Sequence, residues 1–359
     1  MPELSRSPSN PTGYQWVRSP VLWRIALFLA LLVIGEWYVK WNPYYHKAFV
    51  AAAKHSIGHS IVSGGGAVAP AVSLAAAWNY AVQYFLAVWQ AVILGVVVGA
   101  AVQVLVPQDW LLKVLGHRRK SSVIAAGALA MPAMMCTCCS APIVVGLRKQ
   151  QVPTGSALAF WLANPVLNPA TIIFSGFVLG WNFAAVRILF GLALVLVVGL
   201  IANRLWADRN IPAAAQETLT RAALVDERPL WARFFAQLLR ISLSVIPVYI
   251  LLVLGVGALR SWFFPAVGLA HADGLLWIVL LAITGTLFVI PTAGEVPIIQ
   301  TMMHYGLGLG PAYTLLLTLP AISAPSAAMV WRQFPKRALL FTGAAVCVTG
   351  LLAGLTGLL

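Results

Sequence analysis

Nine long apolar segments, separated by short polar stretches, limit how this chain can fold more than any other feature. They cover residues 21–39, 76–106, 121–147, 155–180, 183–205, 237–262, 274–305, 310–331 and 338–358. An apolar run of roughly 20 residues is long enough to cross a bilayer as a helix. Only 9% of the 359 residues are charged, whereas soluble domains carry about 25%. The sequence therefore predicts an all-α, polytopic helical protein of the cell (inner) membrane, with the lipid bilayer as its main partner.

The apolar segments fall into two halves that follow an extra N-terminal span. The expected parts are an N-terminal span with an external loop (1–75), a first membrane repeat (76–205), a cytoplasmic linker (206–236) and a second membrane repeat (237–359). In the first part, Glu36 and Lys40 are typical of the polar flank of a span at the membrane interface. No small-residue cleavage site follows closely, so this span is expected to remain uncleaved.

The two halves share the spacing of their prolines and glycines. The stretch from Ala141 to Gly155 parallels that from Val296 to Gly310, and Pro132 corresponds to Pro291 with four residues fewer in the second half. Chance similarity between apolar sequences is the alternative. The shared register favours an internal duplication.

The basic residues predict how the halves are oriented. They gather at residues 117–120, 148–149, in the 206–236 linker, and at Arg332, Lys336 and Arg337. Cytoplasmic loops carry an excess of Lys and Arg. If all these clusters are cytoplasmic, segment 121–147 must enter and leave on one side. Segment 274–305 then does the same from the other side, and the two halves become inverted repeats, each with a broken re-entrant hairpin. The alternative is nine full spans.

Three of the four cysteines lie within four positions, inside the stretch from Pro132 to Pro142. Proline removes a backbone donor and disfavours a continuous helix, and irregular backbone at membrane depth is tolerated where it lines a cavity. Thiolates are strong ligands for soft metals and thiophilic metalloids. Cys136, Cys138 and Cys139 are therefore candidate metal or metalloid ligands. Cys136 and Cys139 would share a helical face, and an unwound loop would also bring in Cys138; packing as small hydrophobes is the alternative.

Four other polar residues are candidates for the solute site. Glu295 is an acid inside the second broken segment, where a charge is costly and usually functional, so it is a candidate proton carrier; pairing with an arginine is the alternative. It aligns with Ser140 in the first half. Asn164 and Asn168 stand beside prolines in the following span, where their amides either line the pathway or satisfy freed backbone groups.

Several other classes of protein are disfavoured. The net charge of +14 is spread over loops between spans, so we expect no nucleic-acid partner. The Walker A motif and the haem signature C-x-x-C-H are missing, and no cofactor or enzyme activity is expected. The predicted partner is a small-molecule or metalloid substrate, and a homo-oligomer is compatible with the sequence.

The stretch Cys-Thr-Cys-Cys-Ser-Ala-Pro-Ile at 136–143, the Gly-Leu-Arg-Lys that ends at Lys149, and the related second half together resemble a predicted-permease family. This family contains the ArsP organoarsenical efflux permeases and the YraQ proteins, and the resemblance covers roughly residues 80–350. It implies movement of a small solute across the cytoplasmic membrane without ATP. For the ArsP branch it implies a trivalent organoarsenical handled by cysteine thiols, here Cys136, Cys138 and Cys139. Gly294 and Glu295 depart from the small polar residues of that branch.

The sequence thus favours a secondary permease that exports a thiophilic solute, either a trivalent arsenical or a soft metal species, with proton coupling through Glu295. A permease for another small molecule, with structural cysteines, is one alternative. A membrane thiol oxidoreductase is the other.

Overall fold

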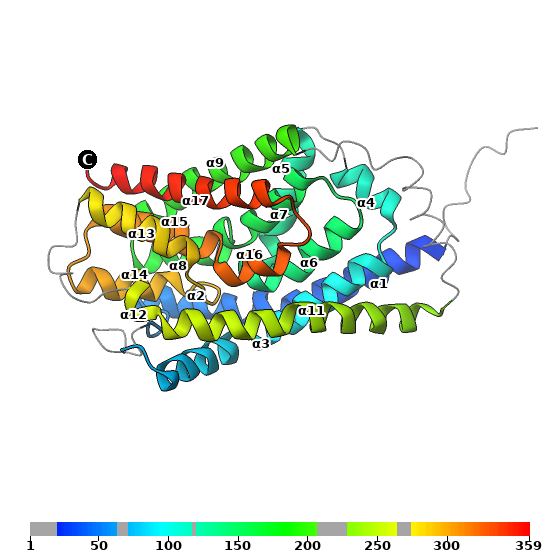
Figure 1. Ribbon diagram of the computed structural model, residues 1–359, viewed down its shortest axis with the longest axis horizontal. Coiled ribbons are helices and arrows are strands. Elements are labelled where there is room, and N and C mark those ends of the chain that lie inside the picture. The colour runs from blue at the N-terminus through cyan, green and yellow to red at the C-terminus, as the bar shows by residue number, and fades with distance from the viewer. Residues whose placement is uncertain (1–19, 63–70, 117–119, 207–227, 264–273) are drawn as a thin grey trace, which may run out of the picture.

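The chain folds as a bundle of α-helices (Figure 1). The computed structural model describes residues 20–62, 71–116, 120–206, 228–263 and 274–359, and no β-strand occurs within these ranges. The expected linker at 206–236 and the basic residues at 117–119 lie largely or wholly outside the described residues.

Seven helical stretches of the described chain are long and apolar enough to cross a membrane. They are Leu22–Lys54, Leu74–Val104, Thr154–Val178, Trp181–Leu205, Leu230–Ala258, Leu309–Val330 and Lys336–Thr356. Each matches an apolar segment expected from the sequence. The prediction of an all-helical, multi-pass membrane protein is confirmed.

The two remaining apolar segments, 121–147 and 274–305, each form a pair of short helices. The first pair is α5 (Lys120–Ala130) and α6 (Thr137–Lys149), and the second is α13 (Leu275–Leu287) and α14 (Glu295–His304). No helix in either pair exceeds 13 residues, well short of the roughly 20 that span a bilayer. In Figure 1 the first pair lies toward the right and the second toward the left.

Both pairs are interrupted close to a proline. After α5 a short 3₁₀ turn, η3 (Met131–Ala133), leads to Met134, and Ala293 occupies the corresponding place in the second pair. Both residues have positive φ angles, 47° and 67° respectively. Non-glycine residues rarely adopt this left-handed conformation, and such strained positions cluster at functional sites.

The first break is shorter than the one expected between Pro132 and Pro142. Helix α6 already begins at Thr137, so Pro142 lies inside the helix rather than ending the break. Proline is tolerated there because neighbouring groups in a packed membrane helix satisfy the carbonyl that it frees.

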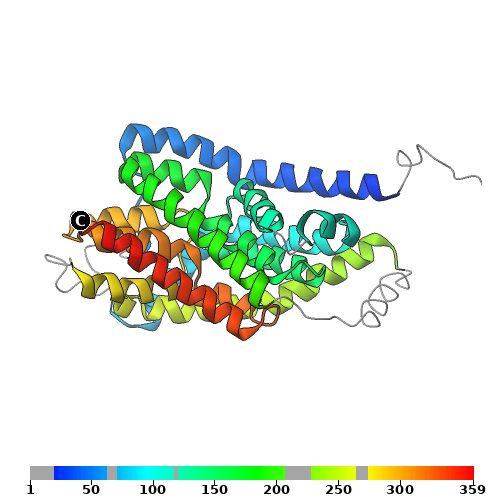
Figure 2. The ribbon, with the colours of Figure 1, turned by 90° about the horizontal axis from the view of Figure 1, so that it is seen from above.

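The N-terminal span extends further than the sequence indicated. Helix α1 (Pro20–Glu36) continues through a π-helical turn, η2 (Trp37–Trp41), into α2 (Asn42–Lys54). This rod runs along one side of the bundle (Figure 2). The expected interfacial flank is therefore wrong: Glu36 and Lys40 are only 2% and 4% exposed and lie in the middle of the helical run.

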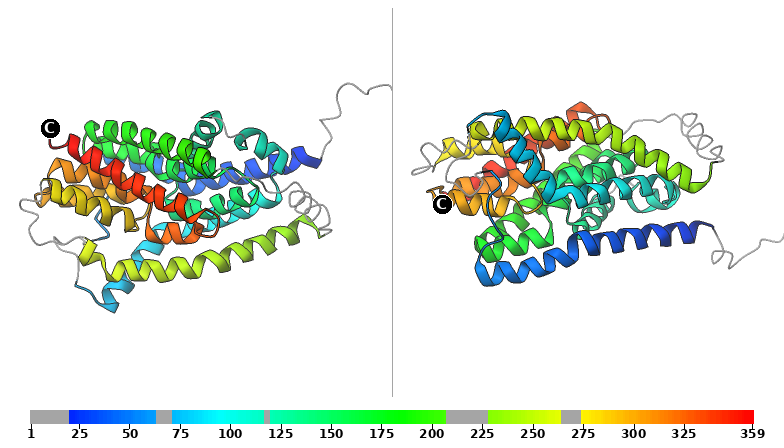
Figure 3. Two further views of the ribbon diagram at one scale, coloured as in Figure 1. Left: turned by 45° about the horizontal axis from the view of Figure 1, so that its top comes forward. Right: turned by 90° about the horizontal axis from the view of Figure 1, so that it is seen from below.

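Figure 3 shows the bundle, with the remaining helices, from two further sides. Their bounds are α3 (Leu74–Val104), α4 (Gln108–Leu115), α7 (Thr154–Val166), α8 (Pro169–Val178), α9 (Trp181–Leu205), α11 (Leu230–Ala258), α12 (Arg260–Phe263), α15 (Leu309–Ala321), α16 (Ala324–Val330) and α17 (Lys336–Thr356). Helix α7 packs on α9 in the first half, and α15 packs on α17 in the second.

Glycines on α3 let α6 approach closely enough to place its N-terminus in the core. A Cβ at Gly99 would lie 2.5 Å from the Pro142 carbonyl oxygen, and one at Gly95 would collide with the Cys139 carbonyl. Small residues spaced four apart are the usual means by which membrane helices pack backbone to backbone.

Candidate functional site

The two breaks face one small cavity in the middle of the bundle. Its volume is about 10 Å³, room for about one water molecule, so the protein is closed around the site. The lining residues come from both halves: Cys136, Thr137, Pro165, Thr171, Ile290, Pro291, Thr292, Ala293, Glu295, Leu319, Pro320 and Ser323.

The cysteines of the first break separate into a pair and a single thiol. Cys136 is the residue directly before α6, where its side chain makes no capping hydrogen bond, and its Sγ lies 3.0 Å from Sγ of Cys139, one helical turn on. Cys138 points elsewhere, with its Sγ 3.6 Å from Oγ of Ser323. All three are buried free thiols. The structure thus brings together two of the three predicted ligands, on the helical face that the sequence indicated.

No group of three His, Cys, Asp or Glu side chains in the described ranges is placed to hold a metal ion. The arrangement in this closed form is a dithiol, which suits a thiophilic atom with two open valences. Cys347, the fourth cysteine, is half-buried, and its thiol lies within hydrogen-bond distance of Thr286 Oγ1 (3.2 Å) and the Ala282 carbonyl (3.4 Å).

Asparagine side chains hold the backbone around this cluster. Asn164 Oδ1 accepts a hydrogen bond from the backbone N–H of Met135 (3.4 Å), directly before Cys136. Asn168 caps α8, where its Oδ1 accepts from the N–H groups of Ala170 and Thr171. Neither residue lines the cavity. The sequence left two roles for these amides, lining the pathway or satisfying freed backbone groups. In this structure both side chains bind backbone groups.

Ser140 is also turned toward its own helix. Its hydroxyl donates to the carbonyls of Cys136 (3.1 Å) and Thr137 (3.3 Å). It therefore steadies the first turn of α6, and the cavity walls do not include it.

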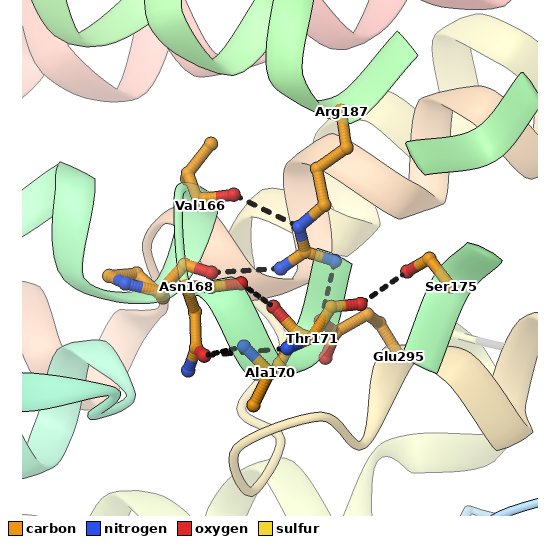
Figure 4. A network of polar contacts seen from close by, with 8 residues as sticks. Val166, Asn168, Ala170, Thr171, Ser175, Arg187 and Glu295 are labelled. Carbon is orange, nitrogen blue, oxygen red and sulfur yellow. Dashed lines mark hydrogen bonds and ion pairs between the residues drawn. The ribbon is translucent and has the colours of Figure 1, made fainter. Parts of the chain in front are cut away.

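Glu295 lies at the start of α14 and is paired with an arginine. Its Oε1 is 2.7 Å from Nη1 of Arg187, and both side chains are almost completely buried. Figure 4 shows how Arg187 reaches across from α9: its Nε donates to the carbonyl of Val166 (2.9 Å) and its Nη2 to that of Pro165 (2.8 Å). Arg187 therefore joins the second break to the α7–α8 break.

Arg187 is not among the site residues predicted from the sequence. Single arginines are common near the ends of membrane spans, so this one did not by itself indicate a site. Lys40 is predicted from the sequence to lie at a membrane interface. The Lys40 ammonium reaches the second break, where Nζ lies 3.2 Å from Oγ1 of Thr292. Arg187 was a single charge within an apolar run, which is a functional-site candidate by default, whereas Lys40 follows directly after one and has Glu36 and Lys47 nearby in the sequence.

Residues 73–357 match the model of a predicted permease family, ArsP_1. The chain belongs to this predicted permease family. The matched range contains the cysteine cluster, Arg187, Glu295 and both breaks.

Relatives from bacteria and an archaeon agree with this family. The chain is 48% identical to the UPF0718 protein YraQ of Escherichia coli K12 over 358 residues, covering 96% of this chain and 95% of that protein. It is 24% identical to the UPF0718 protein MJ0584 of Methanocaldococcus jannaschii over 288 residues, covering 62% of this chain and 78% of the relative. No solved structure gives a significant match.

The family and the seven apolar helices together make this chain a multi-pass membrane protein of a transporter family, and the inner membrane is consistent with its bacterial relatives. The membrane location expected from the sequence, and the family that the cysteine stretch resembled, are confirmed. The family match begins at residue 73, after the α1–α2 rod, whereas the match to YraQ extends over nearly the whole chain.

Proposed function

We propose that this protein is a secondary permease that exports a small thiophilic solute, a trivalent organoarsenical or a soft metal species, through its cysteine cluster. The observation that carries the proposal is the Cys136–Cys139 thiol pair, 3.0 Å apart, on a helix break that lines the central cavity. Thiolate sulfur is polarisable and prefers soft partners. A broken helix facing a cavity at the middle of the bundle is typical of secondary transporters.

In this proposal the two helix pairs are re-entrant hairpins that open at opposite ends of the bundle. The first pair ends beside α3, since Gln150 donates to the carbonyls of Val102 and Gln103 (both 3.2 Å). In the second pair, the middle of α14 lies beside the C-terminal end of α2, since Gln300 donates to the carbonyl of His55 (2.8 Å). These contacts support entry from one side for the first pair and from the other side for the second.

A repeat at a constant offset of 155 positions supports an internal duplication. Gly155 on α7 approaches Gly199 on α9, and their equivalents Gly310 and Gly354 make the same approach between α15 and α17. Two further equivalent pairs are Pro165 with Pro320, inside α7 and α15, and Asn168 with Ser323, the N-caps of α8 and α16. Duplicated breaks would then form the two faces of one solute site.

Glu295 is the proposed proton carrier. In the closed form its carboxylate is held by Arg187 and lines the same cavity as Cys136. Protonation would remove its charge and release the guanidinium, which also holds the α7–α8 break through two carbonyls. Uptake of one proton would therefore loosen the contact between the two halves.

Transport in everted membrane vesicles tests the role of the thiols. Vesicles that contain the protein should accumulate phenylarsine oxide, measured as vesicle arsenic by mass spectrometry. Cys136→Ser and Cys139→Ser should abolish this accumulation, because serine nearly preserves size but removes the soft ligand. Cys347→Ser is the matched control and should transport normally. Normal accumulation by a Cys136→Ser, Cys139→Ser double variant would rule out thiol ligation.

Glu295→Gln separates binding from coupling. Glutamine mimics the protonated carboxyl, so phenylarsine oxide should still bind, as measured by a thermal shift of the purified protein. Accumulation against a gradient should stop. A Gln variant that still concentrates arsenic would show that Glu295 is structural.

One observation favours the oxidoreductase alternative. Cys136 and Cys139 form a C-x-x-C pair at a helix N-terminus, a setting that activates thiols for exchange. In that case a Cys136–Cys139 disulfide would be reduced to two thiols by a dithiol reagent, which would itself be oxidised to its disulfide. The arsenical would block the reduced protein without being transported.

A further inference from the structure

Lys40 is a buried cation whose placement the proposed transport scheme does not yet use. It lies in the π-helical turn η2, near the middle of the longest apolar helical stretch, and is 4% exposed. Its Nζ donates to Oγ1 of Thr292 (3.2 Å) and to the hydroxyl of Tyr44 (3.3 Å). Thr292 lines the central cavity together with Cys136, so the ammonium stands directly behind the cavity wall.

The π turn brings the middle of the rod against both breaks. Trp41, the next residue, donates its indole N–H to the carbonyl of Pro132 in the first break (2.6 Å), while Lys40 holds the second. Single π turns within α-helices are frequent at functional sites, because the extra residue re-aims the side chains.

Lys40 forms no contact ion pair with a carboxylate in the described parts of the chain. The one described ion pair with both partners buried joins Arg187 to Glu295, which leaves that acid engaged. Glu36, one turn earlier, makes no ion pair with Lys40, and its carboxylate oxygens are buried without a hydrogen-bond partner. An ammonium has three N–H donors, and two are used by hydroxyl groups. A third donor therefore remains for a ligand. Among the described residues, Glu36 and the thiolate forms of Cys136 and Cys139 attract the ammonium electrostatically, but none of them accepts a hydrogen bond from it.

The surrounding helices add to the positive potential. Helices α6, α8 and α14 all begin at or near the cavity, at Thr137, Pro169 and Glu295. The N-terminus of a helix carries partial positive charge, and half-helix N-termini in transporters face the anionic groups of their substrates.

We propose that Lys40 is a solute-binding residue that recognises an anionic group, so that a solute with a negative charge beside its thiophilic atom is preferred over an uncharged one such as phenylarsine oxide. The inference deepens the proposed function and rests on the same site. It adds the charge of the substrate class, which the thiol pair by itself leaves open.

A purely structural role for Lys40 makes a different prediction. If it only ties Thr292 to the rod, its loss would change access to the site for every reagent alike. If its charge binds the solute, its loss would change the preference between an anion and a cation of similar size. The ratio between the reaction rates of an anionic and a cationic reagent therefore distinguishes a solute-binding role of Lys40 from a purely structural one.

The test uses Cys136 as a reporter in membrane vesicles of both orientations. In a chain with Cys138, Cys139 and Cys347 replaced by serine, the rates of modification by anionic sulfonatoethyl methanethiosulfonate and cationic trimethylammonioethyl methanethiosulfonate are measured by mass spectrometry. Lys40→Met should lower the anion-to-cation rate ratio by on the order of tenfold, as expected for loss of a nearby charge in a medium of low dielectric constant.

Two variants serve as controls. Lys40→Arg keeps the charge and should keep most of the ratio. Lys47→Met removes a half-buried lysine two turns further along the same rod, and should leave the ratio unchanged.

Three results would overturn the inference: an unchanged ratio in Lys40→Met, an equal fall in Lys47→Met, or a Cys136 that neither reagent reaches from either side. The last would mean that small anions in water have no access to the site. The assay contains no arsenical, so its outcome is independent of whether phenylarsine oxide is transported. A charge-dependent ratio without arsenical transport would uphold the anion site and reject the proposed solute.

Discussion

Replacing Arg187 by methionine removes three buried polar contacts at once while keeping much of the side-chain volume. The guanidinium is 2.7 Å from the Glu295 carboxylate and donates to the carbonyls of Val166 (2.9 Å) and Pro165 (2.8 Å). Arg187 is fully buried, so water cannot replace these partners.

The expected loss of unfolding free energy follows from the buried carbonyls and the carboxylate that Arg187→Met leaves without a partner. Each carbonyl without its donor costs about 1–3 kcal/mol, and removing one partner of a buried ion pair costs about 3–5 kcal/mol. These contributions overlap, because the abandoned carboxylate can take up a proton and neighbouring groups can shift. We therefore expect Arg187→Met to lower the free energy of unfolding by about 3–5 kcal/mol, with methionine limiting any additional cavity cost.

Unfolding in mixed micelles, titrated with sodium dodecyl sulfate, measures this free energy. Arg204→Met is the matched control, since Arg204 is an exposed arginine on the same helix and its loss should cost less than about 0.5 kcal/mol. A double-mutant cycle with Glu295→Gln should show a coupling energy of about 1–3 kcal/mol. Equal costs for Arg187→Met and Arg204→Met, or an additive cycle, would refute the reasoning.

The remaining predictions concern packing and orientation. Gly99→Leu should lose most of its folded, monodisperse protein on size-exclusion chromatography, because a Cβ there already meets the Pro142 carbonyl oxygen at 2.5 Å, whereas Gly343→Leu faces open space and should behave as the parent chain. Gln150→Cys, in a chain without native cysteines, should be blocked by membrane-impermeant thiol reagents from the same side as the 206–236 linker. Blocking from the opposite side would replace the hairpins by nine full spans.

The spans could be predicted from the sequence because bilayer thickness sets a length that apolar runs must meet. Length did not distinguish segments 121–147 and 274–305, which are also long enough to span. The placement of the basic clusters and the prolines within the segments indicated a break in each. Proline alone did not locate the break. Pro142 lies in the sixth position of α6, where close packing against Gly99 and its neighbours, absent from any local pattern, stabilises the helix around it.

The thiol pair was also within reach of the sequence, because positions 136 and 139 share a helical face once a helix begins near Thr137. What separates Cys138 from the pair is a contact with Ser323, 185 positions further along the chain. The periodicity of one helix predicts which side chains are neighbours on it, but not which residues of the other half they face.

Arg187 and Lys40 show why the charged part of the site could not be read locally. The partner of Lys40 at the second break is 252 positions away, and Arg187 pairs with Glu295, more than 100 positions further along the chain. Both side chains nevertheless bind groups at an interrupted helix, a loop hydroxyl in one case and two freed carbonyls in the other. Backbone groups released at membrane depth need hydrogen-bond partners. A cation buried within the membrane is therefore expected to lie next to a helix break, even one that is distant in the sequence. This rule places both Arg187 and Lys40 at the site rather than at a membrane interface.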